Sequence, residues 1–245
     1  MASLFDAAGL DATAPRPLAD KLRPSSLAEV QGQDHLCGEA GLISRMISSG
    51  RITSMILWGP PGTGKTTIAR LLAGEADLHF EQISAIHSGV ADLKKVFEAS
   101  RVRRTDKGQG TLLFVDEIHR FNKAQQDSFL PWMEDGTITL VGATTENPSF
   151  ELNAAVLSRA KVLTLNRLDS NAMAGLLARA EELEDRSLPV TEEAREQLFA
   201  MADGDGRYFL NLVEDLFAVV EVGSERLDAA GLAETIQRRV PVYDK

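Results

Sequence analysis

The sequence predicts an α/β domain with a mainly parallel five-stranded sheet flanked by helices, followed by a small all-helical domain. Short apolar runs alternate with polar, helix-like stretches between residues 55 and 165, as is typical of parallel sheets. After residue 168 the apolar side chains recur only with helical spacing. The first residues are rich in Ala, Pro and Asp and lack periodicity. We therefore expect a flexible arm at 1–19, the α/β domain at 20–167 and the helical domain at 168–245.

The apolar runs are the expected strands, and the stretches between them are the expected helices. Two runs, 56–58 and 112–115, are apolar without a break, which is typical of strands buried on both faces. The expected strands are 55–58, 78–83, 112–115, 137–143 and 161–164. The expected helices are 66–74, 90–103, 123–134 and 153–157.

Two apolar stripes predict helices in the second domain. One stripe, with spacings of three and four, consists of Met173, Leu176, Leu177 and Ala180. A longer one consists of Phe209, Leu212, Val213, Leu216, Phe217 and Val220. Thr191 is a candidate N-cap of a helix between them, because Glu192 and Glu193 favour the positive end of a helix.

Composition excludes several classes of protein. The 245 residues include 26 basic and 36 acidic side chains, for a net charge of −10, which argues against a chain coated with phosphate-binding charge. A single cysteine, Cys37, excludes a disulfide scaffold. The longest apolar runs are too short to cross a membrane, and no basic segment precedes an apolar stretch at the start. We therefore expect a cytoplasmic protein without membrane contact.

The strongest motif is GPPGTGKT at residues 59–66, directly after the first expected strand. It fits the pattern of a phosphate-binding loop, in which glycines let backbone N–H groups surround a phosphate chain. Lys65 would contact the β- and γ-phosphates, and Thr66 would ligate magnesium. A chance match is the alternative, but the strand before the loop and the helix after it make chance improbable. The expected ATP contacts are Gly59, Pro60, Pro61, Gly62, Thr63, Gly64, Lys65, Thr66 and Thr67.

A second motif, LLFVDEIHR, begins at residue 112 and ends its apolar run in two carboxylates. Asp116 could hold magnesium through water, and Glu117 could orient or deprotonate an attacking water. Strands often end in acidic residues, so the pair means little alone. Downstream of a phosphate-binding loop, it is the expected second half of an ATPase site.

Together these motifs resemble those of AAA+ ATPases. Residues 17–36, 54–73, 114–160 and 204–216 resemble the replication-associated recombination protein A family, with clamp-loader subunits and the Holliday-junction branch-migration motor as more distant relatives. The segments HRFNKAQQD and GATTENPSFELN carry most of this resemblance. It extends from about residue 17 to the end, and it implies an AAA+ fold whose helical domain forms a lid over the nucleotide.

The resemblance also implies roles for residues outside the two motifs. Thr145, or alternatively Asn147, would be the sensor 1 residue near the γ-phosphate. Arg159 would be an arginine finger that reaches the nucleotide of a neighbouring subunit, and Arg207 would be the sensor 2 arginine of the lid. The alternatives are a polar turn and two solvated arginines. The residues expected at the adenine are Leu22, Arg23, Pro24, Val30, Gly32 and Gln33, unless this segment is only a linker.

The family implies an enzyme that hydrolyses ATP with Mg²⁺ and acts on DNA in replication-fork maintenance, recombination and repair. The alternative is a nucleotide-gated matchmaker of the clamp-loader kind, which binds DNA and protein partners with little turnover. The implied partners are DNA forks, gaps or ends, and a sliding clamp or single-strand-binding protein; the implied location is the nucleoid. A basic cluster at 101–107 could face DNA or be a solvated loop. Family chains form tetramers through a further C-terminal region, so we expect this chain to be monomeric or weakly associated.

Overall fold

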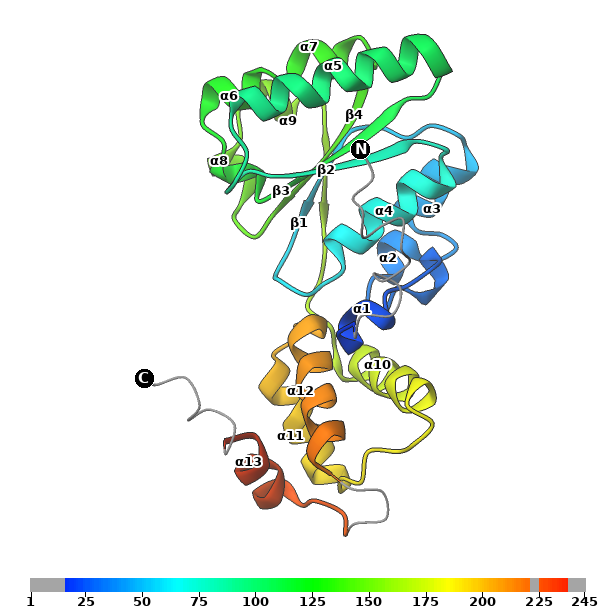
Figure 1. Cartoon of the computed structure of the whole chain (residues 1–245), viewed down its shortest axis with the longest axis vertical. Coiled ribbons are helices and arrows are strands. Elements are labelled where there is room, and N and C mark those ends of the chain that lie inside the picture. Colours follow the sequence, from blue (N-terminus) through cyan, green and yellow to red (C-terminus); the bar gives the residue numbers. More distant parts are fainter. Residues whose placement is uncertain (1–15, 221–224, 238–245) are drawn as a thin grey trace, which may run out of the picture.

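The computed structural model describes residues 16–220 and 225–237, and a parallel sheet forms the centre of the α/β domain (Figure 1). The strand order is β2-β3-β4-β1-β5, and every neighbouring pair is parallel. The five-stranded sheet expected from the sequence is confirmed. Its strands are β1 (Met55–Trp58), β2 (His79–Ser84), β3 (Thr111–Asp116), β4 (Ile138–Thr144) and β5 (Lys161–Thr164).

Side chains of β3 alternate between two apolar cores on opposite faces of the sheet. Leu112 and Phe114 pack in a cluster with residues of α3 (Leu42–Ser48) and α4 (Lys65–Glu75). Leu113 and Val115 pack in the other cluster with residues of α5 (Val90–Lys107). All four side chains are completely buried, so the sheet requires helices on both faces. Figure 1 shows α5 over one face and α3 and α4 over the other.

The single helix expected at 123–134 is wrong: the structure has two short helices there. They are α6 (Lys123–Asp127) and α7 (Leu130–Glu134). Pro131 has no N–H to donate to Asp127, and its ring would clash with that carbonyl in a continuous helix. The break buries Phe129 completely, with its ring 5.7 Å from that of Phe97 in an edge-to-face arrangement.

Several short elements complete the α/β domain. One of them, α8 (Pro148–Glu151), was not expected, and it begins with Pro148 at its first position and Asn147 as its N-cap. The Asn147 side chain accepts a hydrogen bond from the Ser149 N–H at 3.0 Å. The other short elements are α2 (Asp34–Cys37), α9 (Ala154–Leu157) and two 3₁₀ turns, Leu27–Glu29 and Ile118–Arg120.

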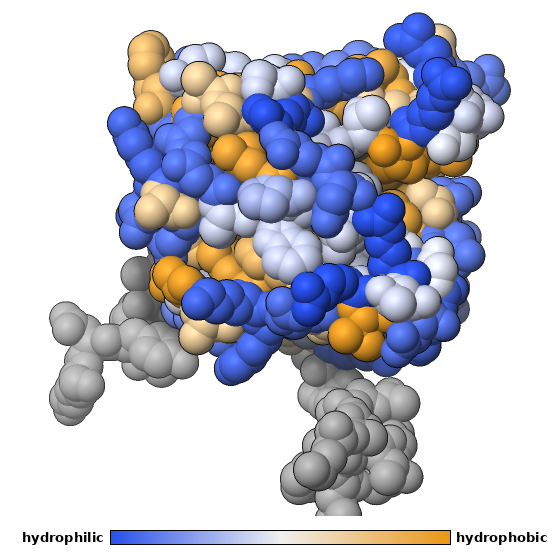
Figure 2. Space-filling view, turned by 90° about the horizontal axis from the view of Figure 1, so that it is seen from above, coloured by the Kyte–Doolittle hydropathy of each residue, from blue (hydrophilic) through white to orange (hydrophobic). Residues whose placement is uncertain are grey.

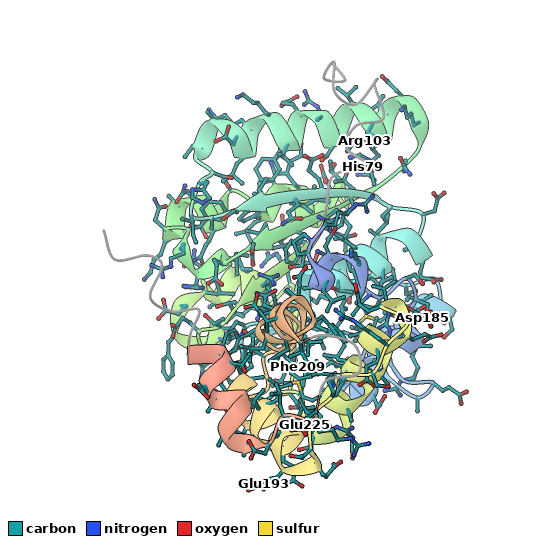
Figure 3. The ribbon with its side chains drawn as sticks, turned by 60° about the horizontal axis from the view of Figure 1, so that its bottom comes forward. His79, Arg103, Asp185, Glu193, Phe209 and Glu225 are labelled. Atoms are coloured by element: carbon teal, nitrogen blue, oxygen red, sulfur yellow. The ribbon has the colours of Figure 1, made fainter. Side chains whose placement is uncertain are left out.

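The second domain is helical, as expected. Phe209 is completely buried at its centre (Figure 3), and the apolar stripes form a core around it. The expected cap is confirmed, because the Thr191 hydroxyl accepts a hydrogen bond from the Ala194 N–H at 3.2 Å. Val220 lies just beyond the helix that its stripe predicts. The helices are α10 (Ser170–Leu183), α11 (Glu192–Ala202), α12 (Gly206–Val219) and α13 (Ala229–Gln237).

The expected arm at 1–19 extends too far along the chain. Residues 1–15 lie outside the described part, but α1 (Leu18–Lys21) is ordered and packs against α12. Leu18 and Leu22, one helical turn apart, are buried in the core of the helical domain. By packing, the segment therefore belongs to the helical domain, although the chain then continues into the α/β domain.

The molecular face shown in Figure 2 is mainly hydrophilic, with apolar residues scattered over it. Two arginines of the basic cluster at 101–107 on α5 contact other parts of the protein: Arg103 donates to the Thr111 hydroxyl at 2.8 Å, and Arg104 to the Asp135 carbonyl at 2.6 Å. Arg103 lies beside His79 (Figure 3), and both are within ion-pair distance of Glu81. None of the described helices combines the length and apolar character needed to cross a membrane.

We expect Phe129→Ala to lower the free energy of unfolding by about 3–5 kcal/mol, because it removes a fully buried ring and leaves a cavity. Phe150→Ala is the matched control. That ring is 85% exposed, so its loss should change the free energy by less than about 0.5 kcal/mol. Urea denaturation followed by circular dichroism measures both. Equal effects would contradict the packing described for α5 and α7.

Candidate functional site

A cleft lies between the α/β domain and the helical domain. Its lining includes the loop after β1, the acidic pair after β3, Thr145 after β4, and the first turn of α12. Parallel sheets bind ligands at the carboxyl ends of their strands. The sequence-predicted residues that line this cleft are Leu22, Arg23, Pro24, Val30, Pro61, Gly62, Thr63, Gly64, Lys65, Thr66, Thr67, Asp116, Glu117, Thr145 and Arg207.

The loop at 59–66, here called the phosphate loop, has the backbone of an anion cradle. Gly62 and Gly64 adopt positive φ angles of +66° and +96°, which favour glycine. The Gly59 N–H donates to the carbonyl of Thr144 at 3.2 Å, so the loop begins against the end of β4. The Thr63 hydroxyl donates to the Pro60 carbonyl at 2.9 Å. Helix α4 starts at Lys65, which leaves its first N–H groups for an anion.

Lys65 is the buried cation of the cleft. Its ammonium donates to the carbonyls of Gly59 and Pro60 at 2.7 and 2.6 Å. Burial lowers the pKa of Lys65 below its ordinary value, and the negative charges of nearby Glu117 and Asp116 oppose that shift. An ammonium has three protons, so one remains for a ligand after these two hydrogen bonds.

The acidic pair lines the same cleft as the phosphate loop. Asp116 is the last residue of β3. Glu117 follows it with a positive φ of +52°, a conformation that non-glycine residues adopt rarely and often at functional sites. Its carboxylate oxygen Oε2 lies 3.3 Å from Nδ1 of His119. The two adjacent residues therefore differ in backbone conformation: Asp116 is extended, and Glu117 is left-handed.

The helical domain contacts the phosphate loop directly. The Gly206 N–H donates to the Gly62 carbonyl at 3.2 Å. Asp205 caps α12 by accepting hydrogen bonds from the N–H groups of Arg207 and Tyr208, both at 2.9 Å. Arg207, in the first turn, lines the cleft. Its positive charge contributes to the lowered pKa of Lys65, so the two cations share one site.

Two of the expected adenine residues have structural contacts instead of lining the cleft. The Gln33 side chain is completely buried, and its amide donates to the Asn166 carbonyl at 2.8 Å and accepts from the Asn166 N–H at 3.0 Å. Gly32 has a φ of +72° and packs against Leu168. These residues fix the connection between the domains. Gly59 and Pro60 also lie outside the lining, and they contribute the carbonyls that bind Lys65.

Asn147 and Arg159 do not line the cleft either. The Asn147 side chain caps α8, whereas Thr145 lies in the lining. The Arg159 guanidinium pairs with Glu134, with Nη2 2.6 Å and Nε 2.8 Å from the same oxygen. It also donates to the Ala155 carbonyl and the Ser158 hydroxyl. Arg159 therefore does not contact this chain's own cleft.

Other lining residues were not found from the sequence. Most are apolar or small, and they come from the helical domain and its N-terminal segment, so only the tertiary fold brings them to the loop. The one polar addition is Gln31, next to the expected Val30. The residues missed are Ala19, Gln31, Leu168, Leu176, Gly206 and Leu210.

Sequence comparisons agree with this geometry. A sequence model of the ATPase family associated with various cellular activities (AAA) matches residues 55–168, and one of the AAA C-terminal domain matches residues 184–245. The chain belongs to the AAA family of ATPases. For an AAA domain, a cleft that joins the phosphate loop to the helical domain implies nucleotide binding.

Relatives and solved structures narrow the similarity. The chain is 47% identical over 237 residues to replication-associated recombination protein A of Escherichia coli K12, and 46% identical over 236 residues to that of Coxiella burnetii. Both alignments cover 94% of this chain and 53% of the relative, so the chain spans about half the length of these relatives. The RuvB Holliday junction branch migration motor of Thermotoga maritima superposes with a TM-score of 0.68 at 27% identity, covering 89% of this chain and 72% of that one. The resemblance inferred from the sequence motifs is confirmed.

We expect Gly62→Ala to destabilise the nucleotide-free protein more than Gly64→Ala. Both substitutions place alanine at positive φ, which costs about 1–2 kcal/mol. An added Cβ at Gly62 would also overlap the Asp205 carboxylate, whereas nothing lies within 4 Å of one at Gly64. This overlap should add about 1–3 kcal/mol. Denaturant titration of both variants gives the difference; no difference would mean that α12 does not press on the phosphate loop.

Proposed function

We propose that the cleft binds ATP with Mg²⁺ and hydrolyses it, and that the chain is the ATPase module of a protein acting on DNA in replication-fork maintenance, recombination and repair. The observation that carries the ATPase proposal is the convergence on one cleft of Lys65, the Asp116–Glu117 pair and Arg207. These residues come from both domains, so a triphosphate in the cleft would connect the two.

The residues suit a magnesium triphosphate. The N–H groups of the phosphate loop, Lys65 and Arg207 are complementary to phosphate charge. The Thr66 hydroxyl and Asp116 carboxylate are oxygen donors of the kind that magnesium prefers, and magnesium in such sites keeps waters and substrate phosphates as its other ligands. Magnesium would supply charge neutralisation between the phosphates. Leu22, Pro24 and Val30 would form an apolar wall for the base.

Glu117 is the proposed group that orients and activates the attacking water. Glu117 lines the cleft, and a carboxylate can accept a proton from water in such a step. Thr145 is the better candidate for sensor 1, because it lines the cleft while Asn147 is engaged as a helix cap. Arg207 would take the sensor 2 role from the lid.

Arg159 is the proposed finger for the site of a second copy of the chain. It is tied to Glu134 rather than to its own cleft, and its side chain is 39% exposed. Exposed ion pairs of this kind contribute little stability, so a triphosphate on a neighbour could compete for the guanidinium. Assembly into a homo-oligomer would then complete each site, with this chain alone only weakly associated.

The DNA role is supported by the names of the relatives and rests on them alone. Our first hypothesis is an ATPase that hydrolyses ATP repeatedly while it acts on DNA forks, gaps or ends. The second is a nucleotide-gated matchmaker, which holds DNA and a sliding clamp or single-strand-binding protein with little turnover. The SLFD segment that loosely resembles a clamp-binding peptide lies at 3–6, outside the described residues. A cytoplasmic, nucleoid-associated location fits either role.

Forked or gapped DNA should raise the steady-state ATPase rate of the chain if it acts on DNA by turnover. The measurement is phosphate release with and without DNA at one protein concentration, with a blunt duplex as the control substrate. DNA binding without any rise in rate would favour the matchmaker. If DNA neither binds to the chain nor raises its rate, the result would contradict the proposed DNA role of this module.

Glu117→Gln should keep ATP affinity and slow hydrolysis by about 10²-fold or more, which is the size of a general-base contribution. Glutamine keeps the shape of the side chain but cannot accept the proton. Equilibrium titration gives affinity, and a single-turnover assay gives the rate. Glu146→Gln, an exposed glutamate near Thr145, is the control and should match the unaltered chain. An unchanged rate in Glu117→Gln would remove Glu117 from the assigned role.

Arg159→Ala should bind ATP normally and hydrolyse it on the order of 10³-fold more slowly when the chain is assembled. Lys65→Ala should fail to bind ATP because it loses the cation for the phosphates. Mixing the two should restore part of the activity, since one variant keeps an intact cleft and the other an intact finger. Arg101→Ala, an exposed ion-paired arginine, is the control. Mixed variants that stay inactive where light scattering confirms assembly would contradict a finger acting between copies.

A further inference from the structure

The buried ring of His119 connects Glu117 to the end of β4. Its side chain is only 8% exposed, and it follows the acidic pair in the 3₁₀ turn Ile118–Arg120. One ring atom, Nδ1, lies 3.3 Å from the Glu117 carboxylate and 2.9 Å from the Thr144 hydroxyl. A single imidazole nitrogen thus faces both the proposed water-activating group and the last residue of a central strand.

Thr144 is itself fixed. It is completely buried, and its hydroxyl oxygen accepts a hydrogen bond from the Glu146 N–H at 3.0 Å. The same oxygen lies 3.3 Å from the Glu146 carbonyl, to which the hydroxyl can donate. These contacts span Thr145, the candidate sensor 1 residue, on both sides. The His119 ring is therefore anchored on the turn that presents Thr145 to the cleft.

The chemistry of the three groups selects one tautomer. An ionised carboxylate is negatively charged and has no proton to donate, so a favourable contact with Glu117 requires a proton on Nδ1. With that proton in place, Nδ1–H donates a hydrogen bond to the Thr144 oxygen at 2.9 Å and attracts the Glu117 carboxylate, 3.3 Å away, electrostatically. The Thr144 hydroxyl then donates to the Glu146 carbonyl. In the other tautomer the hydroxyl donates to Nδ1, and the lone pair of Nδ1 no longer attracts the Glu117 carboxylate.

We propose that His119 is a positioning residue, which holds the Glu117 carboxylate in its working orientation through Nδ1–H and ties it to the turn around Thr145. This inference rests on the role proposed for Glu117. Glu117 has a left-handed backbone and a partly exposed side chain. The His119 ring is a largely buried polar group that lies against its carboxylate. A shift of Thr145 towards a γ-phosphate would move the neighbouring Thr144. Through its contact with Thr144 the His119 ring would move too, and the position of the Glu117 carboxylate would change with it.

Variants at His119 test which ring atom matters. His119→Ala removes the contact, His119→Asn places an amide near the position of Nδ1, and His119→Gln places one nearer Nε2. We expect His119→Ala and His119→Gln to lower the single-turnover hydrolysis rate about tenfold, the size of one lost polar contact with a charged group. ATP affinity should stay within about twofold, and His119→Asn should recover most of the rate. His79→Ala, a partly exposed histidine outside the cleft, is the matched control.

Variants at Thr144 keep the test decisive if His119→Ala folds poorly. Thr144→Val keeps the volume and removes the hydroxyl, whereas Thr144→Ser keeps the hydroxyl. We expect a severalfold loss of rate in the valine variant, with unchanged ATP affinity, and a smaller loss in the serine variant. Normal rates in Thr144→Val and His119→Ala, or recovery by His119→Gln but not by His119→Asn, would overturn the proposal.

A double variant separates this inference from the proposed function. If His119 acts through Glu117, adding His119→Ala to Glu117→Gln should cause no further loss beyond about twofold in a long single-turnover assay. A full additional tenfold loss would overturn positioning through Glu117. Glu117→Gln with an unaltered rate would instead contradict the proposed role of Glu117 itself, whatever His119 does.

Discussion

The contact between the phosphate loop and the first turn of α12 is the constraint on which the cleft depends. The Gly206 N–H donates to the Gly62 carbonyl, and the Asp205 carboxylate occupies the space that a side chain at Gly62 would fill. The same turn carries Arg207 into the lining. The contact consists of a backbone hydrogen bond and of close packing that is possible only because Gly62 has no Cβ. We therefore expect it to tolerate few substitutions. It places the cations of two domains around one volume, where a triphosphate would bind both.

A side-chain contact followed by a short stretch of chain connects the proposed water-activating group to the proposed finger. His119 connects Glu117 to Thr144 at the end of β4. From there the chain forms α8 and α9 and reaches Arg159, which is tied to Glu134 on α7.

Sequence alone predicted the sheet and the phosphate loop because both follow from local rules: continuous apolar runs for buried strands, and a glycine pattern for an anion cradle. It failed where tertiary packing decides. Pro131 interrupts a segment that the sequence pattern predicts as one helix. Leu18 lies in a segment whose composition predicts a flexible arm, yet it is buried in the core of the helical domain. Gln33, expected at the base, is instead buried against Asn166, 133 residues away. From the sequence alone, the residues of the helical domain that line the cleft, such as Leu210, can be predicted only as core positions of a helix. No local signal marks them, because their role depends on how α12 meets the loop.

Amide hydrogen exchange of the chain, with and without Mg²⁺ and a non-hydrolysable ATP analogue, tests the central claim most directly. The account predicts slower exchange in two separate segments on nucleotide binding: the phosphate loop with the start of α4, and the first turn of α12 around Gly206 and Arg207. Both should become protected over the same range of analogue concentration, because one ligand bridges them. Protection confined to the phosphate loop, with the first turn of α12 unchanged at saturation, would contradict a nucleotide site shared between the two domains.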